Sequence, residues 1–338
     1  PQEGTGQAVR FALDALAGFD GDVLVVCGDV PQVRAPDLAA LLAAHRAERP
    51  AASVLTGFAE DPGSLGRVMR NAEGRLAEIV EVRDAADRPD VLRTREFNTG
   101  VYAFDAGAAR PVLESLSRDN DQGEEYVTEA VNRLAGSGAG VVTRTAEEPR
   151  ALLGVNTWAD LAHAVSVLRR RIATEHMERG VHVVDPDTTV IEVDVEIGAG
   201  ARILPFTHVG RGCRIATGGV VGPFARLRGG AVVEASAEAG NFVEMKASTL
   251  AEGAKAKHLT YLGDAYVGER ANIGCGTITA NYDGVRKHRT TIGKGARIGS
   301  GTVLVAPVTV GEGGVTGANA VVTAGRDVPP GATVVGVP

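Results

Sequence analysis

Two stretches in the second half of the chain concentrate the polar side chains that could do chemistry. The first, 240–265, reads GNFVEMKASTLAEGAKAKHLTYLGDA, and the second, 272–289, reads NIGCGTITANYDGVRKHR. With GPFARLRGGA at 222–231 they supply Arg228, Lys246, His258, Tyr261, Asn272, Asn281, Tyr282 and Lys287. Histidine exchanges protons near neutral pH, and lysine and arginine pair with anions. A lone histidine is more often structural, however, and lysine and arginine are mostly solvated surface charge, so residue type alone leaves both interpretations open.

The sequence around these stretches repeats with a period of six. Aliphatic residues stand six apart at eight consecutive positions over 191–233, and glycine often follows them directly. The same phase returns over 267–273, 292–310 and 322–334. One inward aliphatic residue in six makes each hexad one flat side of a triangular coil, with three hexads to a coil. We predict a left-handed parallel β-helix of hexapeptide repeats.

The period lapses at about 236–262 and again at 281–289. Regular repeats need only to stack, whereas inserted loops usually lie on the binding face of a solenoid. We therefore expect the functional residues of the β-helix in these two irregular stretches.

The first 158 residues alternate strand-like and helix-like stretches. DVLVVC at 22–27 is a continuous apolar run, typical of a fully buried parallel strand. The Ala- and Leu-rich stretch 36–49 predicts a helix that begins at proline. Further strands are expected at 52–56, at 101–104 and from 141. This alternation predicts an open α/β sheet with helices on both faces.

Between the two regions, residues 159–180 contain no proline, and their only glycine is the last residue, Gly180. Their apolar residues recur at three- and four-residue spacing, as in an amphipathic helix closed by a glycine. We expect three parts: an α/β domain over 1–158, a connecting helix over 159–180 and the β-helix over 181–338.

Composition and charge exclude several function classes. Of 338 residues 44 are glycine and only 4% are aromatic, which suits many short strands and tight turns. The net charge of −7 disfavours nucleic acid or an anionic membrane as a partner, and no apolar run approaches the ~20 residues of a membrane span. Cys27, Cys213 and Cys275 lack metal-ligand spacing and fit the reduced thiols of a cytoplasmic protein.

The motifs NFVEMK, HLTYLGDA and TANYDG carry a specific resemblance, which extends through the whole chain. The chain resembles the bifunctional bacterial family of N-acetylglucosamine-1-phosphate uridyltransferase/glucosamine-1-phosphate N-acetyltransferase. The resemblance implies a Rossmann-like nucleotidyltransferase domain and an acetyltransferase β-helix that together make UDP-N-acetylglucosamine for bacterial cell-wall polymers. It also implies acetyl-CoA, glucosamine 1-phosphate, UTP and N-acetylglucosamine 1-phosphate as substrates, and a homotrimer with the acetyltransferase pocket between neighbouring coils.

Within this resemblance His258 matches the general base that takes a proton from the attacking amine. The positions that match contacts to the sugar phosphate are Arg228, Lys246, Tyr261, Asn272, Asn281 and Lys287. The positions that match contacts to acetyl-CoA are Cys275, Tyr282, Ser300 and Ala318. We expect Cys275 to pack rather than to act as a nucleophile. Gly336 departs from the pattern, because the family usually has at the end of the coil an arginine that contacts CoA.

In the first domain the resemblance implies a Mg²⁺ site at Asp29 and Asn156, which would screen the two oxyanions of the uridylyl transfer. Asp29 also follows the 22–27 run, and open α/β sheets bind ligands at the carboxyl ends of their strands. The other positions that match nucleotide or sugar contacts, beside Asn156 again, are Gly4, Thr5, Gly66, Glu81 and Asn98.

We expect the chain to be a fragment, because it begins at Pro1 inside a glycine-containing segment and would lack the N-terminal nucleotide loop and the basic C-terminal tail of the family. On that expectation, acetyl transfer is retained and uridylyl transfer is largely lost. Two alternatives stay open. One is a single-function sugar-1-phosphate nucleotidyltransferase with a structural trimerisation coil, and the other is a non-catalytic regulatory subunit, although His258, Lys246 and NYDG argue against both.

Overall fold

The computed structural model describes residues 3–337. Pro1, Gln2 and Pro338 lie outside the described residues, and with them the two ends of the chain that the expectation of a fragment concerns. The chain divides into two compact units, Pro1–Val165 and Ser166–Pro338. The division falls inside α6 (Trp158–Glu178), which is the helix expected over 159–180. Among residues 3–337 no helix has both the length and the apolar character of a membrane span.

Unit 1 is built on a six-stranded sheet in the order β4-β3-β5-β2-β6, with β1 paired to β5. Its strands are β1 (Asp22–Val26), β2 (Ala52–Phe58), β3 (Arg67–Arg70), β4 (Leu76–Val80), β5 (Glu96–Asp105) and β6 (Val141–Thr145). The strands expected at 52–56, at 101–104 and from 141 are therefore confirmed. β2 runs parallel to β6 but antiparallel to β5, so the sheet is mixed.

β1 corrects one expectation. The prediction of a fully buried parallel strand at 22–27 is wrong, because β1 pairs antiparallel with β5 and with no other strand among the described residues. Leu24 and Val26 are 38% and 40% exposed. A continuous apolar run reports how hydrophobic a strand is, but it contains no information about the direction of its neighbour or about whether both edges are paired.

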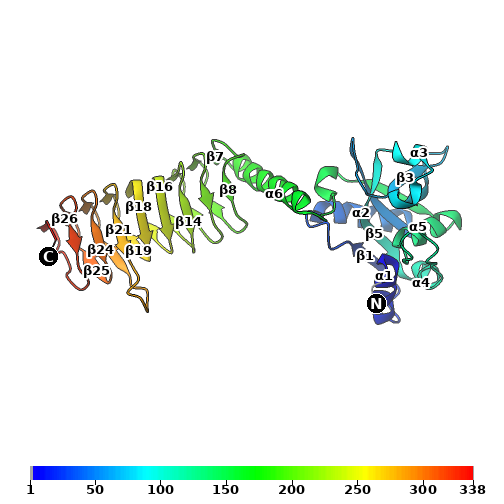
Figure 1. Ribbon diagram of the computed structural model, residues 1–338, viewed down its shortest axis with the longest axis horizontal. Helices are drawn as coiled ribbons and strands as arrows, with labels where there is room; N and C mark the ends of the chain where they lie inside the picture. The colour runs from blue at the N-terminus through cyan, green and yellow to red at the C-terminus, as the bar shows by residue number, and fades with distance from the viewer. Residues whose placement is uncertain (1–2, 338) are drawn as a thin grey trace. The chain divides into compact units, whose positions relative to one another are not determined.

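Helices cover both faces of the sheet, as expected (Figure 1). Successive residues of a strand point to opposite faces. Val54 of β2 packs in the cluster formed with α1, α4 and α5, whereas Leu55 packs in the cluster that contains Leu41 of α2. The helical segments are α1 (Thr5–Ala15), α2 (Ala35–Glu48), η1 (Val82–Ala85), α3 (Pro89–Leu92), α4 (Ala106–Glu114), α5 (Val127–Gly136) and η2 (Pro149–Leu152). The predicted helix at 36–49 is α2.

Unit 2 is a parallel β-helix whose coils stack in chain order (Figure 1). Its first face contains β7 (His182–Val183), β10 (Arg202–Ile203), β13 (Val220–Val221), β16 (Glu238–Lys246), β18 (Lys255–Gly263), β20 (Asn272–Ile273), β23 (Arg297–Ile298), β26 (Val315–Thr316) and β28 (Thr333–Val334). Its second face contains β8 (Val190–Ile191), β11 (His208–Val209), β14 (Arg226–Arg228), β21 (Ile278–Ala280), β24 (Val303–Val305) and β27 (Val321–Val322). Its third face contains β9 (Glu196–Ile197), β12 (Arg214–Ile215), β15 (Val232–Val233), β17 (Thr249–Leu250), β19 (Ala265–Val267), β22 (Thr290–Ile292) and β25 (Val308–Val310).

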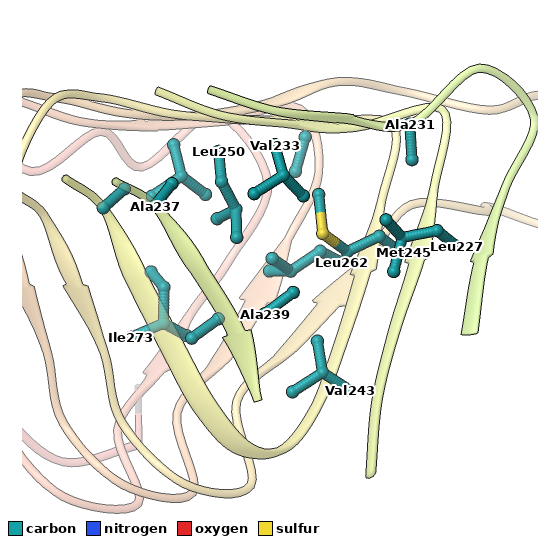
Figure 2. Packing of buried hydrophobic residues seen from close by; sticks show 14 of the residues in the cluster. Leu227, Ala231, Val233, Ala237, Ala239, Val243, Met245, Leu250, Leu262 and Ile273 are labelled. Carbon is teal, nitrogen blue, oxygen red and sulfur yellow. The ribbon is translucent and has the colours of Figure 1, made fainter. Parts of the chain in front are cut away.

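The interior of the coil is filled by the aliphatic residues that define the hexad period. Figure 2 shows Leu227, Val233 and Leu250 among the side chains that meet inside the coil, where all three are fully buried. Methionine and alanine complete the same cluster where the hexad phase lapses, as at Met245 and Ala239. Each buried aliphatic side chain contributes about 1.5–3 kcal/mol relative to an exposed one, so the repeat supplies the hydrophobic stabilisation of this unit.

The two lapses of the period have different structural causes. Arg202 pairs with Val220 and Val220 with Glu238, a spacing of 18 residues, but Glu238 pairs with Lys255 at a spacing of 17. The first lapse is therefore a shortened coil, in which strands β16 and β18 continue without a break. The expectation of an inserted loop is wrong at this place. The second lapse is a true insertion, because Asn272 pairs with Arg297 25 residues later, and it leaves the coil as a loop (Figure 1, orange).

β16 and β18 are long because each crosses from the first face to the second without a break. At the corner between these faces, residues of successive coils adopt positive φ; we call this set the first corner: Phe206, Phe224, Phe242, Leu259, Gly276, Gly301 and Asn319. The glycines adopt this conformation without strain, whereas bulky residues rarely do. The candidate acetyltransferase residues lie on both sides of this corner.

Candidate active sites

His258 and Asn241 form a register pair on the neighbouring strands β18 and β16. Nδ1 of His258 lies 2.7 Å from Oδ1 of Asn241. An amide oxygen can only accept a hydrogen bond, so Nδ1 of His258 must be the donor. The lone pair of the neutral ring then resides on Nε2, and the ring is exposed. With the Nδ1 proton held by Asn241, Nε2 is the ring atom of His258 that can accept a proton.

The acetyl-CoA candidates continue the row of His258 from coil to coil. Tyr261 pairs in register with Ile278, Ile278 with Val303, and Val303 with Val321. Three residues before these positions stand, in the same order, His258, Cys275, Ser300 and Ala318. The predicted base and three predicted CoA contacts therefore form one row beside the first corner, and the row continues from the histidine in small side chains.

Three cations gather on the second face. Arg228 and Lys246 are register partners on β14 and β16, and Lys287 reaches Lys246 from the inserted loop. The side-chain hydrogen bond with Lys246, and then the positive charge of Lys246, lower the pKa of Lys287 below its ordinary value. Two carboxylates hold the other cations, since Nε of Arg228 lies 2.7 Å from Glu244 and Nζ of Lys246 lies 3.1 Å from Asp264. This cluster can receive a dianion such as a phosphate monoester.

Gly263 makes room for two of the predicted sugar contacts. A Cβ at this position would lie 2.5 Å from the hydroxyl oxygen of Tyr261 and 2.7 Å from Nδ2 of Asn281. The two polar groups therefore converge over the glycine. Asn281 also donates a hydrogen bond to Asp264, the residue that holds Lys246. A hydroxyl-bearing ligand could be bound here beside the cations.

The inserted loop is closed by its own contacts. Tyr282 and Lys287 form an antiparallel bridge across it. Asp283 accepts hydrogen bonds from the backbone N–H groups of Val285 and Arg286 and pairs with His288 at 2.7 Å, and these contacts hold the pKa of its carboxyl far below the usual range. The loop thus presents Asn281, Tyr282 and Lys287 from a closed turn.

Asn272 lies apart from the other sugar-phosphate candidates. It is exposed on β20 of the first face. Tyr261 lies on the second face, and the first corner separates the two faces. The structure therefore brings Arg228, Lys246, Tyr261, Asn281 and Lys287 together and places Asn272 across the corner from them.

A separate cavity of about 210 Å³ lies in unit 1. The predicted nucleotide, sugar and metal contacts that line it are Thr5, Asp29, Gly66, Glu81, Asn98 and Asn156. Asp29 and Asn156 meet over Gly154, where a Cβ would lie 3.1 Å from the Asp29 carboxylate and 3.5 Å from Nδ2 of Asn156. Residues spread over about 150 positions of sequence are thus brought to one pocket.

The polar groups of this cavity are held by buried partners. Thr128 donates a hydrogen bond of 3.1 Å to Glu81, whose pKa is raised by burial. Asn98 donates to the hydroxyl of Tyr102 at 2.6 Å. Burial, with the nearby carboxylates, raises the pKa of Cys27 to about 11, so its thiol stays protonated at neutral pH. The pocket offers fixed acceptors and donors suited to a sugar.

Gly4 is the one predicted contact that does not line the cavity. It caps α1 with φ 115°, and a Cβ there would collide with the backbone of Glu125 at 2.4 Å. Thr5 is the first residue of α1 and accepts a hydrogen bond from the N–H of Val127. Gly4 and Thr5 therefore form the start of a helix that is fixed against the 124–127 segment.

Sequence comparisons relate the chain to known proteins. The Nucleotidyl transferase family matches residues 1–173. A "Bifunctional protein GlmU" of Pelobacter propionicus is 43% identical over 98% of this chain and 78% of the relative, and those of Corynebacterium efficiens and Thermobifida fusca are each 41% identical over 99% of the chain and 75% and 76% of the relatives. The chain belongs to the GlmU family. Membership in this bifunctional family disfavours both the single-function and the non-catalytic alternative.

The sequence analysis missed four residues that contact the candidate site residues of unit 2: Asn241, Glu244, Gly263 and Asp264. All four stand inside the motifs NFVEMK and HLTYLGDA. Their partners lie on the neighbouring coil or in the inserted loop. The motifs were the available signal, but the partners depend on the coil length, which the hexad pattern does not give in this region.

Proposed function

We propose that the β-helix transfers the acetyl group of acetyl-CoA to the amine of glucosamine 1-phosphate. The observation that supports this proposal most is the row in which His258 is followed by Cys275, Ser300 and Ala318, with the cation cluster on the adjoining face. A long, thin thioester suits such a row of small side chains, and a sugar phosphate suits the cluster.

In the proposed reaction the neutral amine attacks the thioester carbon while Nε2 of His258 takes a proton from the nitrogen. The C–N bond forms, the C–S bond breaks, and CoA leaves as the thiol after it receives that proton. Arg228, Lys246 and Lys287 would hold the phosphate, and Tyr261 and Asn281 would bind the sugar, with Asn272 across the first corner from them. Tyr282 would contact acetyl-CoA from the inserted loop.

A homotrimer is part of the proposal. The first corner exposes Phe206, Phe224, Phe242 and Leu259, each about half exposed, and the three rings stack with centroids 4.8 and 5.1 Å apart. Bulky residues with positive φ cost about 1–2 kcal/mol each, and exposed apolar rows of this kind often mark protein contacts. The row leads directly to His258 through Leu259, which supports a second copy of the chain as its partner and as one wall of the acetyltransferase pocket.

For unit 1 we propose uridylyl transfer from UTP to N-acetylglucosamine 1-phosphate, with Glu81, Asn98 and Gly66 at the sugar and Gly4 and Thr5 toward the nucleotide. Among the described residues no group of three or more His, Cys, Asp or Glu side chains is placed to hold a metal. Asp29 and Asn156 nevertheless fit Mg²⁺, which binds through one or two carboxylates and takes its other ligands from phosphates and water. When bound, Mg²⁺ would neutralise phosphate charge.

The free thiols Cys27, Cys213 and Cys275 suit a reducing compartment and support a cytoplasmic location. The acetyl transfer is tested by the release of CoA thiol from acetyl-CoA. The proposal expects release with glucosamine 1-phosphate and much less with glucosamine, which lacks the phosphate. Equal rates with both amines would contradict the role of the cation cluster, and no release with either would contradict the proposed reaction.

A further inference from the structure

We infer that Asn241 is a positioning residue that sets the tautomer and orientation of His258. This inference rests on the proposed acetyl transfer and deepens it, because it says why Nε2 rather than Nδ1 would be the basic atom. Oδ1 of Asn241 accepts the Nδ1–H bond of His258 at 2.7 Å. With that proton fixed on Nδ1, the lone pair of the neutral ring is confined to Nε2.

The backbone fixes the two side chains together. Asn241 and His258 are register partners on β16 and β18, and each directly precedes a residue with positive φ, Phe242 and Leu259. The two strands therefore turn the first corner at the same level, so the side chains leave equivalent positions of neighbouring coils. The carbonyl of His258 also accepts a hydrogen bond of 2.7 Å from Thr260, which ties the turn after the histidine.

Asn241 is the row neighbour of His258 best suited to this task. Register places Pro205 and Pro223 in the two coils before Asn241, and Cys275 in the coil after His258. Proline side chains cannot accept a hydrogen bond, and a thiol is a weak acceptor. The amide oxygen of Asn241 is thus the strong acceptor that the row offers to Nδ1.

The test compares Asn241→Ala and Asn241→Asp with wild type, using the full 338-residue chain, acetyl-CoA and glucosamine 1-phosphate. Glu238→Gln is the matched control, because Glu238 lies on the same strand and pairs with Lys257 of β18 at 3.0 Å without touching His258. We expect Asn241→Ala to lower kcat about tenfold or more with the KM of both substrates unchanged. Asn241→Asp should restore most of kcat and move the acid limb of the kcat/KM profile to higher pH, since a carboxylate favours the imidazolium.

A second measurement separates this inference from the proposed function. Long-range ¹⁵N–¹H spectra of ¹⁵N-histidine-labelled protein report which ring nitrogen of His258 carries the proton, whether or not the chain is active. We expect the Nδ1–H tautomer in wild type and in Glu238→Gln, and a mixture of tautomers in Asn241→Ala. An unchanged tautomer in Asn241→Ala, or an unchanged kcat in an active protein, would overturn the positioning role. An inactive wild type with the expected tautomers would instead contradict only the proposed reaction.

Discussion

Nζ of Lys246 lies 3.1 Å from Oδ2 of Asp264, the same carboxylate that accepts a hydrogen bond from Asn281. One acid thereby orients both a cation proposed for the phosphate and an amide proposed for the sugar hydroxyls. Asp264 itself has φ 50°, a conformation that aspartate and asparagine tolerate better than other side chains. The carboxylate is therefore placed by the turn that follows Gly263.

Asp264→Asn should raise the KM for glucosamine 1-phosphate. The substitution keeps the backbone conformation but removes the charge that holds Lys246, so the phosphate and the sugar lose prearranged contacts worth about 0.5–1.5 kcal/mol, or up to about tenfold in KM. Steady-state kinetics would show this increase with the KM for acetyl-CoA unchanged. An equal rise in both KM values would mean that Asp264 supports the fold rather than the sugar site.

Because of Lys287, sugar-phosphate binding should weaken at a lower pH than it would with a lysine of ordinary pKa. The side-chain hydrogen bond with Lys246 and the charge of Lys246 hold the pKa of Lys287 below the ordinary lysine value. The proton, and with it the attraction to phosphate, is therefore lost before the pH reaches about 10.4. The KM for glucosamine 1-phosphate should therefore rise through the alkaline range in wild type and stay flatter in Lys287→Arg, which remains charged. Parallel profiles for the two proteins would contradict this role.

Glu81→Gln should stabilise unit 1. Burial raises the folded-state pKa of Glu81, so the protein is most stable with this carboxyl protonated, and that stability is lost as the pH rises through the folded pKa. Glutamine removes the buried charge and keeps an oxygen for Thr128. The melting temperature should rise at pH 7, and the gain should shrink near about pH 4, where glutamate is largely protonated in both states. Exposed Glu73→Gln is the control, and a loss of stability at pH 7 would contradict the argument.

Phe224→Gly should dissociate the proposed trimer and leave the coil folded. Glycine suits φ 55° and relieves about 1–2 kcal/mol of strain, which offsets two ring contacts worth about 0.5–1.5 kcal/mol each. Sedimentation should report monomers with little acetyl transfer, whereas Phe11→Ala, at an exposed phenylalanine of unit 1, should stay trimeric. A wild-type monomer with full acetyl transfer would contradict the trimer.

The sequence predicted the β-helix well because each hexad places one aliphatic residue inside, and such residues as Ile203 and Val221 are fully buried. It could not predict the pairing of His258. With the regular coil of 18 residues His258 would face Gly240, and only the shortened coil of 17 places Asn241 beside it. The motifs marked the candidate site, but the contacts inside it depend on one residue of coil length. The edge position of β1 was missed for a related reason, since hydrophobicity does not encode strand neighbours.

The most direct test of the account is the kcat of acetyl transfer to glucosamine 1-phosphate in wild type and in His258→Ala. His258 is exposed, so the variant should fold and should bind both substrates with near wild-type KM. The account predicts a fall in kcat of about 10²–10⁴-fold, the usual contribution of a general base. An unchanged kcat in His258→Ala would contradict it.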